Sequence, residues 1–348
     1  MRPINYQLTN TIINRLIEVE VTVTELRCLD IPKDIFRHYT KQQFTQNVFH
    51  IAHMVGQNLT LKETEKFIQG KLEHDGREEY TLLQNYKNAL DYVRSNDGNA
   101  YLDINAELMI HVNKLLIHQW KEEWEARIRT SGEINTAFDT WVQLCDTSLD
   151  AMTITKELTN TFDWYKNNIT RIHFLIRLPI MLYRLLQIQP FSHLNKFTFI
   201  ATMDFLMQKH EYLQNSFLCT AKIFDRNSDA YLGLWKEAIE SPSGNITSWI
   251  ERFLLDLATE LKELKQEIVR EIANEDKNNN QPFLDLNKRQ LKILRYLQSI
   301  PSVKREDYVQ MFDVSTMTAF RDLNELVKRK VIKVDGKGRA TKYVLANR

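Results

Sequence analysis

Residues 186–200 read LQIQPFSHLNKFTFI, and this stretch is the most informative part of the chain for the fold. An apolar segment runs into Pro190 and Phe191, a short turn follows, and a second apolar segment, residues 197–206, begins directly after Asn195 and Lys196. The first backbone amides of a helix have no partner within the helix, so they form an anion site. The stretch therefore predicts a helix–loop–helix with the layout of a phosphate site.

The composition indicates a mostly helical protein. Nine glycines and seven prolines are few for 348 residues, and both residue types disfavour helix interiors. No apolar run approaches the roughly 20 residues that span a bilayer, and the N-terminus lacks the apolar core of a signal peptide. The cysteines have no metal-ligand spacing, so we expect plain thiols in a reducing compartment. These features predict a cytoplasmic protein without membrane contact; the cysteines are Cys28, Cys145 and Cys219.

Helical periodicity marks most of the elements before residue 273. Between residues 126 and 148 the period breaks down, and alternation around 138–142 indicates a short hairpin. A long amphipathic helix begins near Asn245 and carries its apolar stripe to Ile272. The sequence leaves open whether this stripe packs on the same chain or on a second copy in a homodimer. The other predicted helices are residues 42–56, 60–71, 79–95, 103–125, 150–167, 171–187 and 197–210.

A polar run at residues 274–282, NEDKNNNQP, marks the clearest boundary in the chain. It contains turn-forming residues and no apolar side chain, which is typical of a linker. The length also favours two domains at about 100–200 residues each. We therefore expect an N-terminal helical region at 1–100, a core at 101–273, a linker at 274–283 and a C-terminal module at 284–348.

Residues 189–200 resemble the signature of Fic-domain proteins, H-P-F-x-[DE]-G-N-G-R-x-x-R, which transfer AMP or related phosphate-containing groups to target hydroxyls. The resemblance extends over roughly residues 30–260, because residues 79–93 fit the family's E-x-x-x-x-x-N-x-x-x-A-L-x-Y-V stretch. It implies a mainly α fold, a Fic-type helical bundle with a small β-hairpin flap. In the family this flap aligns the target protein, and we expect it within residues 129–144.

Most signature residues that carry the family's chemistry are replaced. The family's general base, a histidine, is Gln189, which takes up no proton in the useful range. The acidic residue that holds Mg²⁺ is His193, and imidazole is a poor ligand for this hard cation. The two arginines are Phe197 and Ile200. The remaining positions are two glycines, replaced by Leu194 and Lys196, and three matches, Pro190, Phe191 and Asn195.

The family's inhibitory segment, S-x-x-x-E-G, is replaced as well. Its serine position is Ile51 and its glutamate position is Val55, while Gly56 matches. In the family this glutamate contacts the second arginine of the signature, which is Ile200 here. The two partners are lost together, and such a paired loss indicates relaxed catalytic demand.

These replacements predict a protein that lacks AMP-transferase activity, with no intact catalytic residue, no metal ligand and no productive ATP or Mg²⁺ binding. Asn195 and Lys196 are the candidate phosphate site, although a solvated lysine at a helix start is the plainer interpretation of Lys196. The alternative is a divergent Fic/Doc-type transferase, or protein adenylyltransferase (AMPylator), that moves AMP or phosphate from ATP to a protein hydroxyl. Asn195-Lys196 resembles the Doc loop D-A-N-K-R, and His193 is then a displaced base.

The C-terminal module is basic. Residues 288–348 hold 15 Lys and Arg against 6 Asp and Glu, whereas the preceding residues hold 31 against 39. Helices are expected at 288–300, 304–312 and 315–330, followed by strands at 331–334 and 342–345 with a basic loop between them. Residues 315–326 fit S-x-x-T-x-x-R-D-L-x-x-L and resemble the recognition helix of a winged helix. The expected buried face of that helix is Ala319, Phe320, Leu323, Leu326 and Val327.

A winged helix with this charge predicts a DNA partner. The resemblance places the exposed residues of the recognition helix in the major groove and the residues of the wing on the DNA backbone. Fic proteins with an appended winged helix are a common bacterial arrangement, which favours a regulator or adaptor. The plainer alternative is that both domains make only protein contacts. The predicted DNA-binding residues are Thr316, Met317, Thr318 and Arg321 on the helix, and Lys337, Arg339 and Lys342 on the wing.

Overall fold

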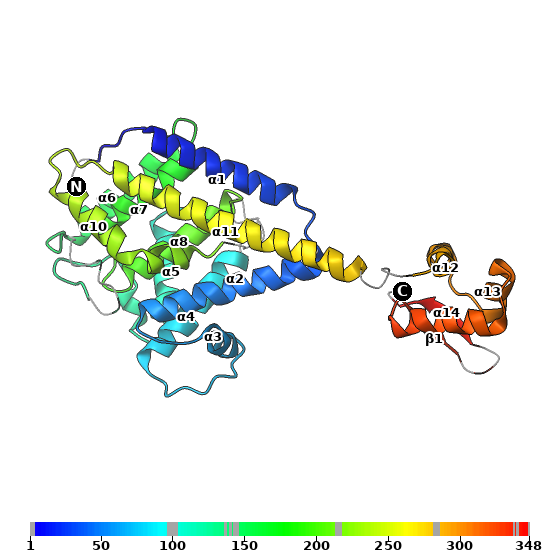
Figure 1. The fold of residues 1–348 in the computed structure, drawn as a ribbon. Helices are drawn as coiled ribbons and strands as arrows, with labels where there is room; N and C mark the ends of the chain where they lie inside the picture. The colour runs from blue at the N-terminus through cyan, green and yellow to red at the C-terminus, as the bar shows by residue number, and fades with distance from the viewer. Residues whose placement is uncertain are drawn as a thin grey trace. The chain divides into compact units, whose positions relative to one another are not determined.

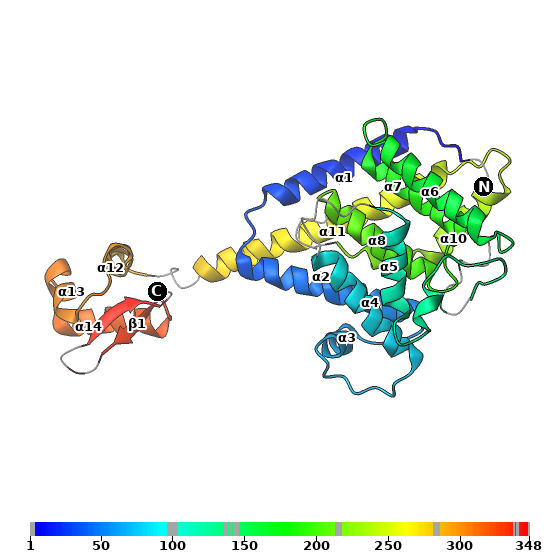
Figure 2. The same cartoon turned by 180° about the vertical axis from the view of Figure 1, so that it is seen from behind.

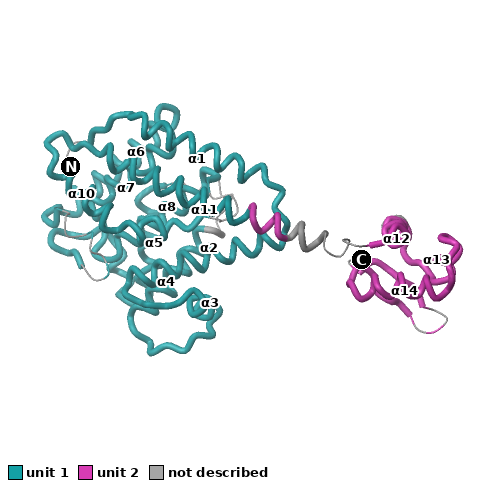
Figure 3. The backbone as a smooth tube through the Cα atoms, viewed as in Figure 1, with its two compact units in different colours: residues 1–268 teal, residues 269–348 magenta. Residues whose placement is uncertain are grey.

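The computed structural model divides the chain into two units, residues 1–268 and 269–348 (Figure 3). It describes residues 4–95, 104–135, 138, 141, 146–212, 218–280, 286–336, 338 and 341–346. The boundary between the units falls inside a long helix, before the polar run at residues 274–282. The division into an N-terminal region and a core at residue 100 stays a prediction.

The described part of the first unit is helical (Figures 1 and 2). Every helix that periodicity predicts is present, although the second begins nine residues earlier than expected. The first, ninth and tenth helices were not predicted. The helices are α1 (Asn10–Cys28), α2 (Lys33–Met54), α3 (Leu61–Ile68), α4 (Glu78–Ser95), α5 (Ala106–Ile117), α6 (Ala151–Asn167), α7 (Phe174–Ile188), α8 (Asn195–Lys209), α9 (Thr220–Arg226), α10 (Ser228–Glu240) and α11 (Thr247–Asn280), with a 3-10 turn, η1 (Glu123–Glu125), after α5.

The prediction of one helix over residues 103–125 is wrong, because α5 ends at Ile117. The side-chain amide of Asn85 donates to the carbonyls of Leu116 and His118, and so satisfies acceptors at the helix end. Gln119 then takes a left-handed conformation, φ 56°, which turns the chain towards η1. This tertiary contact with α4 overrides the helical pattern.

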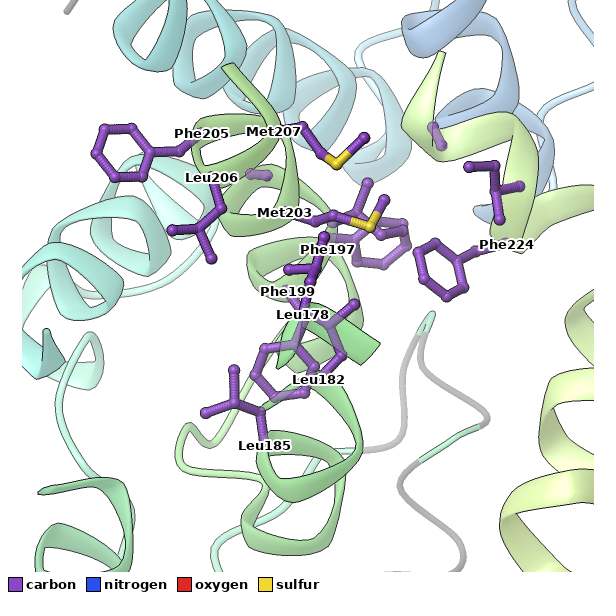
Figure 4. Close-up of a cluster of buried hydrophobic side chains, with 14 of the residues drawn as sticks. Leu178, Leu182, Leu185, Phe197, Phe199, Met203, Phe205, Leu206, Met207 and Phe224 are labelled. Atoms are coloured by element: carbon purple, nitrogen blue, oxygen red, sulfur yellow. The ribbon is translucent and has the colours of Figure 1, made fainter. Parts of the chain in front are cut away.

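Helix α8 lies at the centre of the first unit. It packs against α4, α5 and α7, and its residues 195–207 are buried around the whole circumference. A helix that is enclosed on all sides is typical of the interior of a bundle. Figure 4 shows its side chains in one cluster with Leu178, Leu182 and Leu185 of α7 and Phe224 of α9. This packing fixes the six-residue turn 189–194 between α7 and α8.

Helix α11 packs along the first unit through part of its apolar stripe. Its residues from Trp249 to Leu261 belong to the core of the same chain, and the Trp249 indole donates to the Pro179 carbonyl at 2.9 Å. Helix α1 lies alongside it (Figures 1 and 2), and Lys265 bonds to Glu25 at 2.5 Å. The helix is longer than expected, because α11 continues to Asn280 instead of ending before residue 274. No glycine or proline lies between Thr247 and Pro282 to end the helix earlier. The linker at residues 274–283 and the homodimer stay predictions.

The second unit contains the predicted three helices and a two-stranded hairpin. Strands β1 and β2 are antiparallel, with Ile332 opposite Leu345. Ser315 caps the third helix by accepting from the Thr318 amide at 3.1 Å, as the sequence predicts. The elements are α12 (Lys288–Ser299), α13 (Arg305–Phe312), α14 (Thr316–Lys328), β1 (Ile332–Asp335) and β2 (Lys342–Leu345).

Two further sequence predictions concern the environment of the chain. None of the helices in the described ranges has both the length and the apolar character that crossing a bilayer requires. Cys28 is an exposed free thiol and Cys219 is a buried one. Cys145 lies outside the described residues.

The free energy of unfolding is expected to fall as the pH is lowered from 6.5 towards 4, because His210, at the end of α8, is buried. The His210 ring stacks on the Phe174 ring, with 4.0 Å between the ring centroids. Burial lowers the pKa of His210 from 6.5 to about 4, and the positive charges of Arg177 and Lys209 add to this. Within this window the unfolded chain binds a proton that the folded chain excludes, so acid favours unfolding. Calorimetric melting between pH 7 and pH 4 should show this fall, and His210→Gln should make it smaller. An unchanged fall in that variant would exclude His210 as the cause.

Candidate functional site

The turn between α7 and α8 has left-handed backbone at both ends without a glycine. Gln189 has φ 43° and Leu194, at a glycine position of the signature, has φ 58°. The left-handed conformation costs a non-glycine residue roughly 1–2 kcal/mol. Both side chains are buried, so packing offsets this strain. The loop therefore takes, with two non-glycine residues, the left-handed backbone that ordinarily favours glycine.

Asn195 holds the loop closed. Its Oδ1 accepts from the Phe191 amide at 2.9 Å, and its Nδ2 donates to the Phe191 carbonyl at 2.8 Å. The side-chain amide thus bonds to its own loop through both polar atoms. Helix α8 begins here with no side-chain cap. The asparagine of the signature has a structural role in this loop, and any phosphate contact would have to come from the backbone.

The base position and the two arginine positions of the signature are buried in the core. Gln189 is fully buried, and neither polar atom of its amide has a hydrogen-bond partner in the described part of the chain. Phe197 packs with Met203 and Phe224 in the cluster of Figure 4. Ile200 is buried as well. Apolar packing therefore fills the space where the family has two cationic side chains.

Lys196 does not match the solvated lysine that was the plainer interpretation of the sequence. It is buried, with Nζ 5.2 Å from the Phe197 ring centroid and 5.9 Å from that of Trp141. A desolvated cation over aromatic faces gains about 2 kcal/mol. These contacts help to stabilise the charge inside the body. Lys196, at the second glycine position, thus contacts Phe197, at the first arginine position.

His193, at the acidic position of the signature, contacts a carboxylate from another part of the chain. Its Nε2 lies 2.8 Å from Oε2 of Glu125 in η1, and its ring meets the Trp120 ring edge to face at 5.5 Å. Its carbonyl accepts from Nδ2 of Asn113 at 2.9 Å. Burial works to raise the pKa of Glu125, but the hydrogen bonds from His193 and the Glu122 amide lower it. The imidazole is therefore held by its neighbours on two sides.

A pocket of about 410 Å³ opens beside His193. Ser192 and His193 are the residues of the loop that line it, so Gln189 does not face it. At its rim Arg127 forms a forked ion pair with Glu133, with distances of 3.0 and 3.1 Å, and this contact lowers the pKa of Glu133 to about 2. The other lining residues are Trp124, Glu125, Gly132, Ile134 and Asn135.

Arg129 joins the predicted flap to the loop. It is fully buried, and its Nε donates to the Gln189 carbonyl at 2.7 Å while a terminal nitrogen donates to the Asp146 carbonyl at 3.0 Å. Ile128 and Phe191 form an antiparallel bridge beside it. The chain before residue 136 is thus fixed against the loop. The hairpin predicted around 138–142 lies mostly outside the described residues.

The positions of the inhibitory segment are also packed away. Ile51 and Val55 are buried at the end of α2, and Gly56 follows with φ 83°, a conformation that favours glycine. His50 and His53 each place Nδ1 2.7 Å from the Asp225 carboxylate of α9. The end of α2 is therefore anchored to α9.

The second unit exposes most of its predicted DNA-binding residues. Thr316, Met317, Arg321 and Lys342 are exposed, while Thr318 is half-buried and bonds to Ser315 at 2.9 Å. Within the described ranges, Arg321 has no ion-pair partner. Lys337 and Arg339 lie outside those ranges. The helix residues thus share one solvent-facing side of α14.

Asp322 fixes the rotation of α14. Its buried carboxylate accepts from Nε of Arg289 at 2.9 Å, from the Tyr308 hydroxyl at 3.1 Å and from Nδ2 of Asn287 at 3.2 Å. Neighbouring residues on a helix point about 100° apart. An inward Asp322 therefore turns Arg321 towards solvent.

Sequence reasoning missed the residues that build the site from outside the signature. Arg129, Glu125 and Asn113 belong to no motif, and each acts through a contact with a residue at least 60 positions away. The only local signal in the sequence was that Arg129 comes just before a predicted turn. The partners of these three residues are brought close by the packing of the helices, and helical periodicity does not predict that packing.

The described residues do not fit a magnesium-bound triphosphate. They contain no group of three or more His, Cys, Asp or Glu side chains placed to hold a metal. The Glu125 carboxylate is bonded to His193, and the arginine positions are apolar and buried. A triphosphate in this loop would find neither the two arginines nor the acidic metal ligand of the signature, and the ammonium group of Lys196 lies over Phe197 and Trp141.

Gln189→Met is expected to raise the free energy of unfolding by about 1–2 kcal/mol, since a buried amide without partners costs roughly 1–3 kcal/mol. Methionine has a similar length and no polar group to satisfy. Urea unfolding of the whole chain measures the change, and Gln189→Glu should be destabilising. A loss of stability in the methionine variant would mean that the amide has a bonding partner.

Comparisons with known proteins agree with both units. A family profile for a DeoR-like helix-turn-helix domain matches residues 289–340. A Fic family protein from Desulfovibrio desulfuricans is similar over 100% of this chain and 99% of its own, with 18% identity and a TM-score of 0.56. Residues 134–508 of Fic-1 from C. elegans cover 76% of this chain and 73% of that one, with 16% identity and a TM-score of 0.59.

A Fic domain containing signalling protein from Bacteroides thetaiotaomicron gives a TM-score of 0.54 at 11% identity, over 75% of this chain and 97% of its own. No curated protein sequence matches the chain. The structural likeness establishes the fold: the chain has a Fic-type helical fold followed by a helix-turn-helix domain.

Proposed function

We propose that this chain is a Fic-fold protein without transferase activity, whose C-terminal domain binds double-stranded DNA, and that it acts as a regulator or adaptor. One observation carries the first part: the loop keeps its backbone shape while its base and arginine positions are sealed in the core. Removing a general base costs about 10²–10⁴-fold in rate. The loss of the cationic groups that stabilise phosphate charge adds to this.

The proposal of DNA binding is supported by features of the second unit. Its recognition helix exposes Arg321 without an ion-pair partner in the described ranges, and a hydrogen-bond network around Asp322 sets the side that faces solvent. The net charge of residues 288–348, 15 basic against 6 acidic, favours a polyanion. The pocket beside His193 gives the body a surface for a protein partner.

A fluorescence anisotropy titration with duplex DNA tests the DNA proposal. Arg321→Ala in the full chain should weaken binding to a selected duplex by about 1–3 kcal/mol and relax its sequence preference. Arg295→Ala, an exposed arginine on α12, is the matched control and should keep the preference. Wild-type protein that binds no duplex at low salt would refute the proposal and favour protein contacts.

A second candidate is a divergent transferase that moves AMP or phosphate to a protein hydroxyl. The observation that favours it is the His193–Glu125 pair, 2.8 Å apart, at the wall of the 410 Å³ pocket. A histidine oriented by a carboxylate is the arrangement of a general base. Labelled ATP separates the candidates: transfer that His193→Ala and Glu125→Gln both reduce supports the transferase, and no transfer supports the regulator.

A further inference from the structure

Phe320 differs from its sequence prediction. It was expected on the buried face of α14, yet 42% of its surface is exposed, and the neighbouring Met317 is 75% exposed. Ala319, Leu323 and Leu326 fill the core of the unit without it. A large aromatic side chain on the outer face of a recognition helix needs a reason other than packing.

Arg305, the first residue of α13, covers one face of Phe320. Its guanidinium carbon lies 4.9 Å from the ring centroid. Its Nε is buried without a hydrogen-bond partner in the described part of the chain, so the stack, rather than a hydrogen bond, holds this end of the side chain. The planar cation is thereby oriented before any ligand arrives, which lowers the entropy that binding must lose.

The charge of Arg305 is not neutralised within the described residues. Two acidic residues follow it in sequence, but no ion pair joins them to Arg305, and the Asp307 carboxylate accepts from the Lys304 amide at 2.8 Å. Arg305 therefore presents a free positive charge beside an exposed aromatic ring. In the same helix-turn-helix, Met317, Phe320 and Arg321 follow the i, i+3, i+4 spacing of one helix face.

We propose that Arg305 and Phe320 form one DNA-reading element, in which Arg305 binds a backbone phosphate and Phe320 contacts the C5-methyl group of a thymine in the major groove. The proposal rests on the proposed DNA binding of α14. Thymine is the base that offers an apolar group in the major groove, and aromatic side chains contact its methyl. The first helix of a helix-turn-helix crosses the backbone, where a phosphate is available to Arg305.

The alternative occupant of this surface is an apolar segment of another protein. The geometry favours DNA, because such a segment would leave the Arg305 charge desolvated without a partner, whereas a phosphate pairs with it. The exposed Arg321 next to Phe320 adds a second cation to the same face.

The test begins by selecting duplexes from a random library with the full-length protein, then replacing each enriched thymine by uracil, which lacks only the methyl group. Wild-type protein should lose roughly fourfold in affinity at one thymine. Phe320→Ala should bind the thymine and uracil duplexes equally, while Phe320→Leu should keep part of the difference. The uracil comparison on wild-type protein needs no variant, so a folding defect does not obscure it.

Arg305→Ala should weaken binding to all duplexes alike and lower the slope of log affinity against log salt by about 1, with Arg305→Lys restoring the slope in part. DNA binding that ignores uracil replacement and keeps its salt slope in Arg305→Ala would overturn the inference while leaving DNA binding intact. Equal capture of an apolar peptide by wild-type protein and Arg305→Ala would favour a protein surface. The absence of any DNA binding would instead refute the proposed function.

Discussion

Arg129→Ala should be among the most destabilising single substitutions in the first unit, at about 4 kcal/mol of unfolding free energy. The guanidinium is fully buried and donates to carbonyls of both the flap and the end of α7, including Gln189 at 2.7 Å and Ile188 at 3.3 Å. Alanine would leave these acceptors buried and unpaired. An arginine at a helix C-terminus also offsets the negative end of the helix dipole. Urea unfolding of the full chain measures the loss.

Arg127→Ala is the matched control, since this arginine lies two residues away and pairs with Glu133 at the half-exposed pocket rim. Exposed ion pairs contribute about 0–1 kcal/mol, so its removal should be nearly neutral. Amide hydrogen exchange should also rise at residues 128–135 in Arg129→Ala. Equal losses of unfolding free energy in Arg129→Ala and Arg127→Ala would contradict the role assigned to Arg129.

Asp322→Ala should destabilise the second unit by about 3 kcal/mol, because removing one partner of a buried charged network leaves the others unsatisfied. Three donors from α12, its cap and α13 converge on this carboxylate. The loss should appear as an earlier unfolding transition for this unit, followed by circular dichroism of the full chain. DNA binding should weaken in parallel as α14 loses its orientation.

Two comparisons isolate the charge of Asp322. Asp322→Asn keeps the shape and one acceptor, so it should lose less stability than alanine does. Glu325→Ala, which removes a surface pair with Arg329 and a long contact of 3.5 Å from Gln290, should cost less than Asp322→Ala. Asp322→Ala with unchanged unfolding would show that α14 is positioned by its apolar face alone.

The fold was largely predictable because its elements carry local signals. The Thr60 capping box, the Asp150 cap and the Ser315 cap begin helices where the sequence placed them. The loop at residues 189–194 identified the helical architecture even with most of its chemistry replaced, since burial of Leu194 maintains a backbone shape that the signature achieves with glycine.

The site was less predictable because it depends on contacts between distant segments. Periodicity extended α5 beyond Ile117, where Asn85 ends it. Its place at a helix start favoured a solvated Lys196, whereas its ammonium group is buried near the Trp141 and Phe197 rings. Apolar character placed Phe320 in the core, but the stack with Arg305 holds it outside. In each case at least one deciding partner, Asn85, Trp141 or Arg305, lies outside the element concerned.

Incubation of the full chain with Mg²⁺ and ATP labelled on either the α- or the γ-phosphate tests the central claim most directly. No label should enter the purified protein, and a bacterial lysate should take up no more label with the protein than without it; Gln189→His should not change this, because Phe197 and Ile200 still fill the arginine positions. Incorporation of either label by wild-type protein, abolished by His193→Ala, would contradict the claim and establish a working transferase.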